Sequence, residues 1–92
     1  MANNIYTSKV PHLDLHGETT AFLEYLLNEF IADNLKQKNK FIVVIHGWNS
    51  QILMKETHRL LKKDKRVIRF YIDRFNIGQT IIELDIWLIG IN

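Results

Sequence analysis

The sequence predicts a small α/β protein, a two-layer sandwich in which one four-stranded mixed sheet carries two helices on a single face. Two observations support this prediction. Two strand-like segments, 10–16 and 41–45, are each followed by a segment of helical periodicity. Two more alternating segments, 66–75 and 80–87, are separated by a turn too short for a crossover, so they pair antiparallel. The order along the chain is therefore β-α-β-α-β-β.

Composition and length favour a single folded domain. The chain has 92 residues, of which 47% are hydrophobic and 24% charged, which argues against disorder. We expect a flexible arm over residues 1–9 and one domain over residues 10–92. The absence of cysteine excludes disulfides and thiolate metal sites. No secretory signal is visible and the apolar run 86–91 is too short to span a bilayer, so we expect a cytoplasmic protein without a membrane partner.

The first strand and helix follow from a short alternating segment and a long apolar stripe. Leu13 and Leu15 alternate with polar residues, so one face of the strand is apolar. Gly17 allows a sharp turn at its end, and Thr19 is a suitable helix N-cap. The apolar residues that recur at helical spacing after this cap are Leu23, Leu26, Leu27, Phe30, Ile31 and Leu35.

The second strand and helix are predicted over residues 41–63. Phe41–Ile45 is apolar on both faces and rich in β-branched residues, as expected of an interior parallel strand. A loop over 47–50 leads into a helix from Gln51 to Lys63. The inward residues of this helix are Leu53, Leu60 and Leu61.

The last two strands alternate with period two. On the third strand the residues of one face are Ile68, Phe70 and Ile72, and on the fourth they are Ile82, Leu84 and Ile86. The turn between the strands is predicted at Asn76-Ile77-Gly78. Pairing these strands as an antiparallel hairpin places the third strand at one edge of the sheet.

The order of the strands follows from handedness. Right-handed crossovers place both helices on one face of the sheet, and the more apolar last strand takes an interior place, which gives the order 1-2-4-3. The opposite face is open and polar, and its predicted residues are Asp14, His16, Arg69, Tyr71, Glu83 and Asp85. We assign Ile42 and Val44 to this register with His46, where the two aliphatic residues need cover from the N-terminal arm.

The candidate functional residues lie at two corners of the same composition. The first two strands end in His16-Gly17 and His46-Gly47. Adjacent parallel strands bring both corners to one carboxyl edge, where α/β sheets bind ligands. There Asp14 and His16 form an acid–base pair that can transfer a proton at neutral pH. Three alternatives remain. Asp14 and His16 could be a purely structural pair at the sheet edge, and His46 could only bind a loop carbonyl. The three residues could also form a metal site.

Three segments of the sequence resemble the Smr (small MutS-related) domain. They are the motif Leu13-Asp14-Leu15-His16-Gly17, the strand that ends in His46-Gly47, and the C-terminal motif Gly78-x-Thr80-x-x-x-Leu84. The resemblance covers nearly the whole chain after residue 9. It implies the fold of the C-terminal domain of translation initiation factor 3 and an endonuclease or binding function on nucleic acid. The partners it implies are single-stranded or structured RNA, then DNA, and the ribosome for members that cut messenger RNA on stalled ribosomes.

The resemblance assigns catalytic roles to Asp14, His16 and His46, but the second corner departs from the family. The family usually continues His-Gly-Lys-Gly-x-Gly, whereas this chain reads His46-Gly47-Trp48-Asn49-Ser50-Gln51. The missing lysine and glycines weaken catalysis more than binding. Because the acid–base pair of Asp14 and His16 is present, the first expected function is nevertheless RNA cleavage without metal or other cofactor. The alternatives are a nucleic-acid-binding module that does not cut and a protein-interaction domain that uses the open sheet face.

Candidate nucleic-acid contacts surround the two corners. Backbone N–H groups at Gly17, Gly47 and Ser50 suit a phosphate, although Ser50 is equally suited to be a plain N-cap. Trp48, with Asn49 beside it, is either a stacking platform for an unpaired base or an aromatic plug.

A basic stripe follows on the second helix. Its members, at i, i+4, i+7 and i+8, are Lys55, Arg59, Lys62 and Lys63. The stripe has two interpretations, a track for phosphates and a solvated face that Glu56 or Asp64 partly neutralises. We favour the phosphate track because the stripe descends from the predicted active edge.

Overall fold

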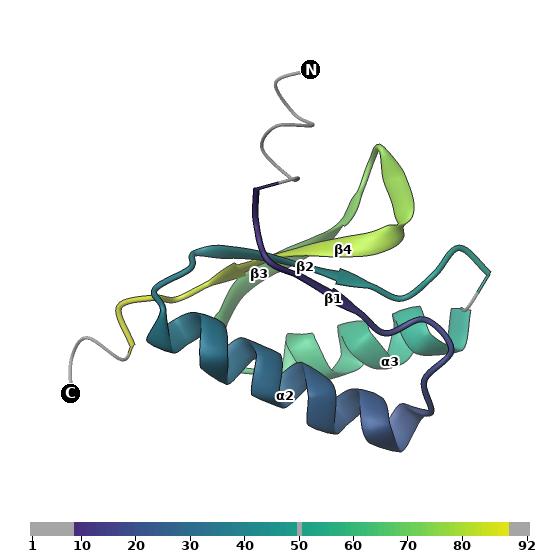
Figure 1. Ribbon diagram of the computed structural model, residues 1–92, viewed down its shortest axis with the longest axis horizontal. Helices are drawn as coiled ribbons and strands as arrows, with labels where there is room; N and C mark the ends of the chain where they lie inside the picture. The colour runs from purple at the N-terminus through teal and green to yellow at the C-terminus, as the bar shows by residue number, and fades with distance from the viewer. Residues whose placement is uncertain (1–8, 50, 89–92) are drawn as a thin grey trace.

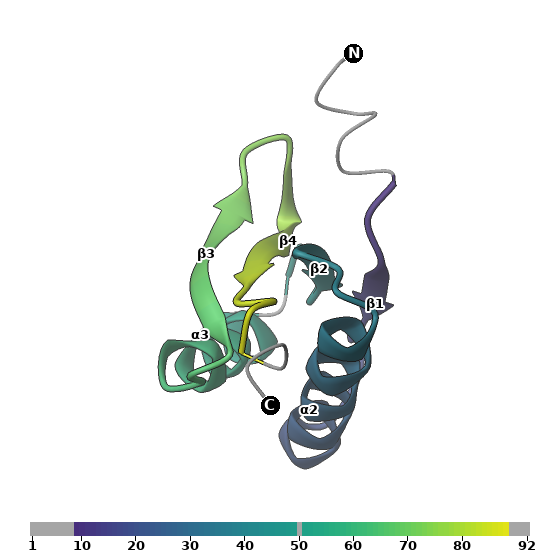
Figure 2. The same ribbon diagram turned by 90° about the vertical axis from the view of Figure 1, so that its left-hand side faces the viewer.

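The computed structural model describes residues 9–49 and 51–88, so that the predicted arm lies outside it except for Lys9. The elements in chain order are β1 (His12–Asp14), α2 (Thr20–Lys36), β2 (Phe41–Ile45), α3 (Gln51–Lys62), β3 (Val67–Asp73) and β4 (Asn76–Leu84). The strands form one sheet in the order β1-β2-β4-β3, in which β1 and β2 are parallel and the other pairs antiparallel. Both helices cover the same face (Figures 1 and 2), which confirms the predicted topology.

Helix α2 begins at the predicted cap and buries the predicted stripe. The Oγ1 atom of Thr19 accepts a hydrogen bond from the Phe22 N–H at 3.3 Å, which satisfies one of the free donors at the helix start. The buried members of the stripe are Leu23, Leu27, Ile31 and Leu35, and the partly buried ones are Leu26 and Phe30. This stripe packs against the sheet and supplies the α2 part of the core.

The assignment of Ile42, Val44 and His46 to the open face is wrong. Val44 pairs with Leu13 and Ile42 with Ile82, and all of them belong to the core between sheet and helices. His46 continues this inward register and is only 1% exposed. Because both faces of β2 are apolar, its sequence contains no periodicity that distinguishes the covered face.

The β3–β4 turn lies two residues earlier than predicted. The turning residues are Arg74 and Phe75, and Asn76–Gly78 form the start of β4. The Asp73 carboxylate accepts hydrogen bonds from the Phe75 N–H at 2.9 Å and from Gln79 Nε2 at 2.8 Å. Such Asp-initiated turns are common in hairpins, and Asp73 was the missed signal. The hairpin tip bends away from the helix layer (Figure 1).

The predicted apolar face of β3 is interrupted by a β-bulge. The pairing register shifts between Val67 and Arg69, so that Ile68 is the extra residue. Val67 and Phe70 pack against the core, whereas Ile68 is 47% exposed. Strict alternation from Ile68 therefore predicted the wrong face for this residue.

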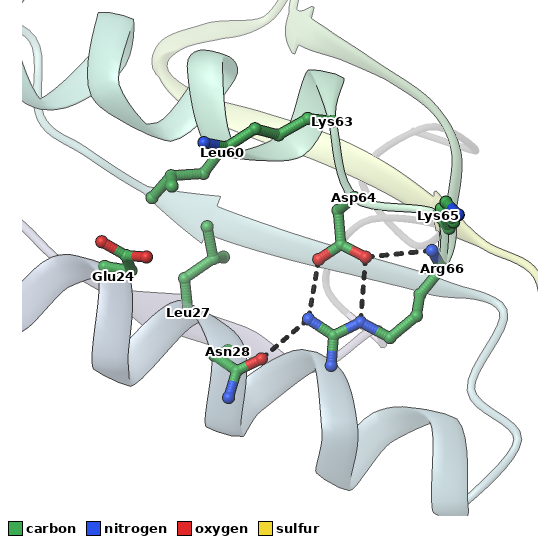
Figure 3. A pocket seen from close by; sticks show the side chains of 8 residues that line it. All are labelled: Glu24, Leu27, Asn28, Leu60, Lys63, Asp64, Lys65 and Arg66. Atoms are coloured by element: carbon green, nitrogen blue, oxygen red, sulfur yellow. Dashed lines mark hydrogen bonds and ion pairs between the residues drawn. The ribbon is translucent and has the colours of Figure 1, made fainter.

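An ion pair fixes the loop between α3 and β3 (Figure 3). The Asp64 carboxylate accepts hydrogen bonds from Arg66 Nε at 2.9 Å, Nη2 at 2.7 Å and the backbone N–H at 2.9 Å. The same Nη2 donates to the Asn28 side chain of α2 at 2.9 Å. Burial alone would raise the pKa of Asp64, but the hydrogen bonds from Arg66 lower it. The loop is thus tied to the neighbouring helix.

Candidate functional site

The two His-Gly corners meet at the carboxyl edge of β1 and β2. Gly17 has φ 82° and Gly47 has φ 97°, a left-handed conformation that favours glycine. A Cβ atom on Gly47 would lie 3.4 Å from the Cβ of His16, so the corners are in direct contact. Together they line a depression of about 580 Å³, whose other lining residues are Trp48, Asn49, Gln51 and Ile52.

The first corner carries an exposed ion pair. His16 Nδ1 lies 2.6 Å from Asp14 Oδ1, and the same oxygen accepts the His16 backbone N–H at 3.1 Å. The hydrogen bond to Asp14 raises the pKa of His16 above 6.5 and the reciprocal bond lowers the pKa of Asp14. The His16 side chain is 70% exposed, so its ring can exchange protons with a ligand in the depression.

The second corner carries a buried histidine. His46 Nε2 lies 3.0 Å from Thr80 Oγ1, and His58 Nε2 of α3 lies 2.7 Å from the same oxygen. A hydroxyl has a single proton, so one ring donates to Thr80 and the other accepts from it. His46 Nδ1 lies 3.3 Å from the Gly47 carbonyl, where it can act only as a donor, so its Nε2 accepts from Thr80. His58 Nε2–H therefore donates to the Thr80 hydroxyl, and the hydroxyl donates to His46 Nε2.

Burial lowers the pKa of both His46 and His58. Both rings therefore favour the neutral form at pH 7. The exposed His16 ring differs, because its hydrogen bond to Asp14 raises its pKa. Sequence reasoning missed His58 and the role of Thr80. The available signal was the position of His58, three residues before the inward Leu61 and therefore on the inner side of α3.

The backbone N–H of Gly47 is occupied. It donates to the Gly78 carbonyl at 2.9 Å, as does the N–H of His46. In this structure the N–H is therefore engaged by β4, because the end of β2 remains paired with that strand. The phosphate contact at Gly47 stays a prediction. Gly47 also contributes the left-handed turn that brings the loop against His16. Ser50, the third predicted donor, lies outside the described residues.

Trp48 lies over the backbone of β4. A Cβ atom added to Gly78 would come within 2.6 Å of Trp48 Cδ1, so only glycine leaves room for the indole there. The side chain nevertheless stays 70% exposed. Asn49 lies next to it and lines the depression. This arrangement excludes a buried aromatic plug.

The basic stripe lies on the exposed side of α3 but is partly neutralised. Arg59 Nη2 and Nε bind the Glu56 carboxylate at 2.6 and 3.0 Å. Lys55 and Lys62 are exposed. Glu56 therefore removes one charge from the predicted phosphate track, while Asp64 pairs with Arg66 instead.

Metal binding and membrane insertion are two further functions to compare with the described residues. Across 9–49 and 51–88, no three His, Asp or Glu side chains group closely enough to hold a metal ion, which includes Asp14, His16 and His46. In the same ranges, neither helix has the length and apolar character needed to cross a membrane.

Comparison with known proteins identifies the family. The Smr domain family model matches residues 13–84. The Smr domain of Thermus thermophilus MutS2 superposes with a TM-score of 0.78 at 23% identity, covering 82% of this chain and 98% of that one. YdaL, a stand-alone small MutS-related protein from Escherichia coli, gives 0.75 at 18% identity, covering 79% of this chain and 63% of that one. No curated protein is significantly similar in sequence. The chain belongs to the Smr domain family.

Proposed function

We propose that this Smr domain is an endonuclease that cuts RNA by metal-independent acid–base catalysis. The observation that carries the proposal is the exposed pair of His16 and Asp14, 2.6 Å apart, at the rim of an open depression. The ordinary alternative for an exposed ion pair is a small contribution to stability. A pair that shifts the pKa of a histidine beside a depression in an Smr domain favours proton transfer instead.

In the proposed mechanism, the neutral His16 takes the proton of a ribose 2′-hydroxyl, which attacks the adjacent phosphorus. The 5′-oxygen leaves with a proton supplied by the protonated ring or by water. Asp14 holds the Nδ1–H and stabilises the imidazolium. Helices α2 and α3 both begin at this edge, so their positive ends favour a phosphate there.

The remaining predicted residues take supporting roles in this proposal. His46, buried and neutral, holds the second corner against α3 and is not a proton carrier. Lys55 and Lys62 attract the phosphate chain, with a smaller contribution from Arg59 because of its pairing with Glu56. RNA is the first partner and DNA the second. Association with the ribosome, implied by the family resemblance, stays a prediction.

A second candidate function is nucleic-acid binding without cleavage. The Gly47 N–H, which could have stabilised a charged phosphorane, is bound to Gly78. The loop that follows lacks the lysine and glycines usual in the family. Both observations reduce catalysis more than they reduce binding.

Labelled RNA and DNA of one sequence distinguish these functions. For the endonuclease, RNA is cut in the presence of chelator, a strand with 2′-deoxyribose at the cut site resists, and His16→Ala lowers the rate by roughly 10²–10⁴-fold. His12→Ala is the matched control, because His12 is also exposed on β1 but binds the Val10 carbonyl at 2.7 Å. Cleavage of DNA that stops in chelator would contradict the mechanism. Tight binding without any cleavage would support the second candidate function, nucleic-acid binding without catalysis.

A further inference from the structure

A second hollow adjoins the depression at His16 and shares Trp48 with it. Its volume is about 320 Å³. Its lining residues are His46, Gly47, Trp48, Gln51, Met54, Ile72 and Ile77. Four of these, His46, Gly47, Trp48 and Gln51, also line the larger depression. The two hollows are therefore neighbouring parts of one surface, and Trp48 lines both.

The indole is held in place but not covered. Its Cδ1 and Nε1 atoms lie where a side chain on Gly78 would be, at 2.6 and 3.1 Å from an added Cβ. The Gly78 carbonyl binds the two N–H groups at the end of β2, so the start of the loop is fixed to the same residue. The side chain is thus supported along its pyrrole edge while 70% of it faces solvent.

The surroundings of Trp48 are apolar and exposed. Ile77 and Ile72 of the hairpin line the hollow, and Ile52, which lines the larger depression, is also exposed. Clustered exposed apolar side chains in a soluble protein are typical of a binding surface. No described residue that lines the hollow carries a full charge at pH 7, since burial keeps His46 neutral. A phosphate therefore does not suit this hollow.

We infer that the hollow binds one unpaired nucleobase of the strand whose phosphate lies at His16. The inference rests on the proposed function and adds the substrate class, a single strand. The indole and the aliphatic side chains of Ile72 and Ile77 suit the flat faces of a base. The Gln51 amide has both donors and an acceptor for the edge of the base. A base inside a duplex cannot enter, because its faces are stacked and its edge is paired.

Fluorescence of Trp48 tests the inference directly. The sequence has two tryptophans, and Trp87→Phe leaves Trp48 as the sole one. The probe is a short 2′-O-methyl RNA, which lacks the attacking hydroxyl, offered as a single strand and as a blunt duplex. We expect the single strand to quench Trp48 and the duplex to leave it unchanged. An abasic scan should show one position at which affinity falls roughly 5- to 150-fold, the range of base–aromatic stacking energies.

Two substitutions assign the lost affinity to the hollow. Trp48→Ala should lower affinity by a similar factor, and an abasic site at the sensitive position should then cause no further loss. Trp48→Phe should retain most of the affinity and most of the abasic penalty. The matched control is Trp87→Ala, since Trp87 is 72% exposed and follows β4 at the opposite end of the sheet. This control should leave affinity unchanged.

The outcomes separate this inference from the proposed cleavage. A flat abasic scan, equal quenching by duplex, or no quenching by any oligonucleotide overturns the base site even if unmodified RNA is cut. Conversely, failure to cut unmodified RNA refutes the endonuclease alone. If Trp48→Ala instead converts a dimer to a monomer in sedimentation without changing affinity, a second copy occupies the patch and the inference is wrong.

Discussion

Two corners of identical composition, His16-Gly17 and His46-Gly47, lie in contact and have opposite environments. The His16 side chain is 70% exposed and its pKa is raised by Asp14. His46 is buried against Thr80 and its pKa is lowered by burial. The first corner is suited to move a proton, and the second to hold a fixed shape.

The neighbouring elements explain this difference. β1 is an edge strand, and its corner continues into solvent before α2 begins. β2 lies between β1 and β4, and α3 packs across its end, so the ring of His46 meets Thr80 from β4 and His58 from α3. A His-Gly motif at a strand end therefore does not specify a chemical role until its covering elements are known.

The largest expected contrast is in folding stability. His46→Ala should lower the free energy of unfolding by about 2–4 kcal/mol, because it leaves a cavity and removes a partner of the buried Thr80 hydroxyl. His16→Ala should change it by less than about 0.5 kcal/mol, since the side chain is exposed. Leu15→Ala, at a fully buried position of β1, should cost about 2–5 kcal/mol and calibrates the scale.

Urea unfolding at pH 7 measures all three variants. Thr80→Val keeps the shape of the buried residue and removes its hydroxyl, so it separates the hydrogen bonds from the cavity. Equal losses for His16→Ala and His46→Ala would contradict the contrast between the corners.

A second prediction concerns stability as a function of pH. The folded pKa of His46 and His58 lies below the ordinary 6.5, so the unfolded chain binds protons more readily. Stability should therefore fall as pH decreases through 6.5 toward those lower values. His16 has a raised pKa and acts in the opposite sense. Its contribution to folding stability is complete below pH 6.5 and is lost as pH rises through its folded pKa.

Unfolding midpoints between about pH 5 and 8 test this linkage. His58→Gln should reduce the loss of stability on acidification, because it removes one ring with a lowered pKa. His16→Gln should increase that loss, because it removes the ring with a raised pKa. A wild-type stability that rises on acidification through this range would show that the buried rings accept protons freely.

A third prediction concerns the pH profile of RNA cleavage. The proposed mechanism needs the base form of His16 for attack, so the rising limb of the profile should have its midpoint above 6.5. Asp14→Asn removes the carboxylate that raises this pKa, so the midpoint should move down toward the ordinary value. The maximal rate should fall less than in His16→Ala because an amide oxygen still orients the ring. An unchanged midpoint would mean that Asp14 does not control His16.

The smallest expected effect concerns the stripe on α3. Lys55→Ala and Lys62→Ala should each reduce the slope of log affinity against log salt by about 0.7 on single strands if each contacts one phosphate. Arg59→Ala should reduce it less, since Glu56 already pairs with Arg59. Binding titrations at several salt concentrations measure the slopes. Equal slopes in all variants would exclude the stripe from the interface.

Local sequence was sufficient for much of the fold. The bounds of β2, the Thr19 cap and the apolar stripe of α2 follow from neighbouring residues, and the strand order follows from the short β3–β4 connection and crossover handedness. The pair Asp14 and His16 was also predictable, because its two members are separated by a single residue. Apart from the strand order, these features depend on interactions within a few positions of the chain.

The inward direction of Ile42, Val44 and His46 required the tertiary structure. Both faces of β2 are apolar, so only the helices that pack on it decide which face is covered. The buried network joins His46 to Thr80, 34 residues later, and Thr80 to His58, 22 residues earlier. No local pattern relates residues so far apart. Their meeting depends on the sheet register and on the position of α3 across it, which together bury one histidine of the two corners and leave the other in water.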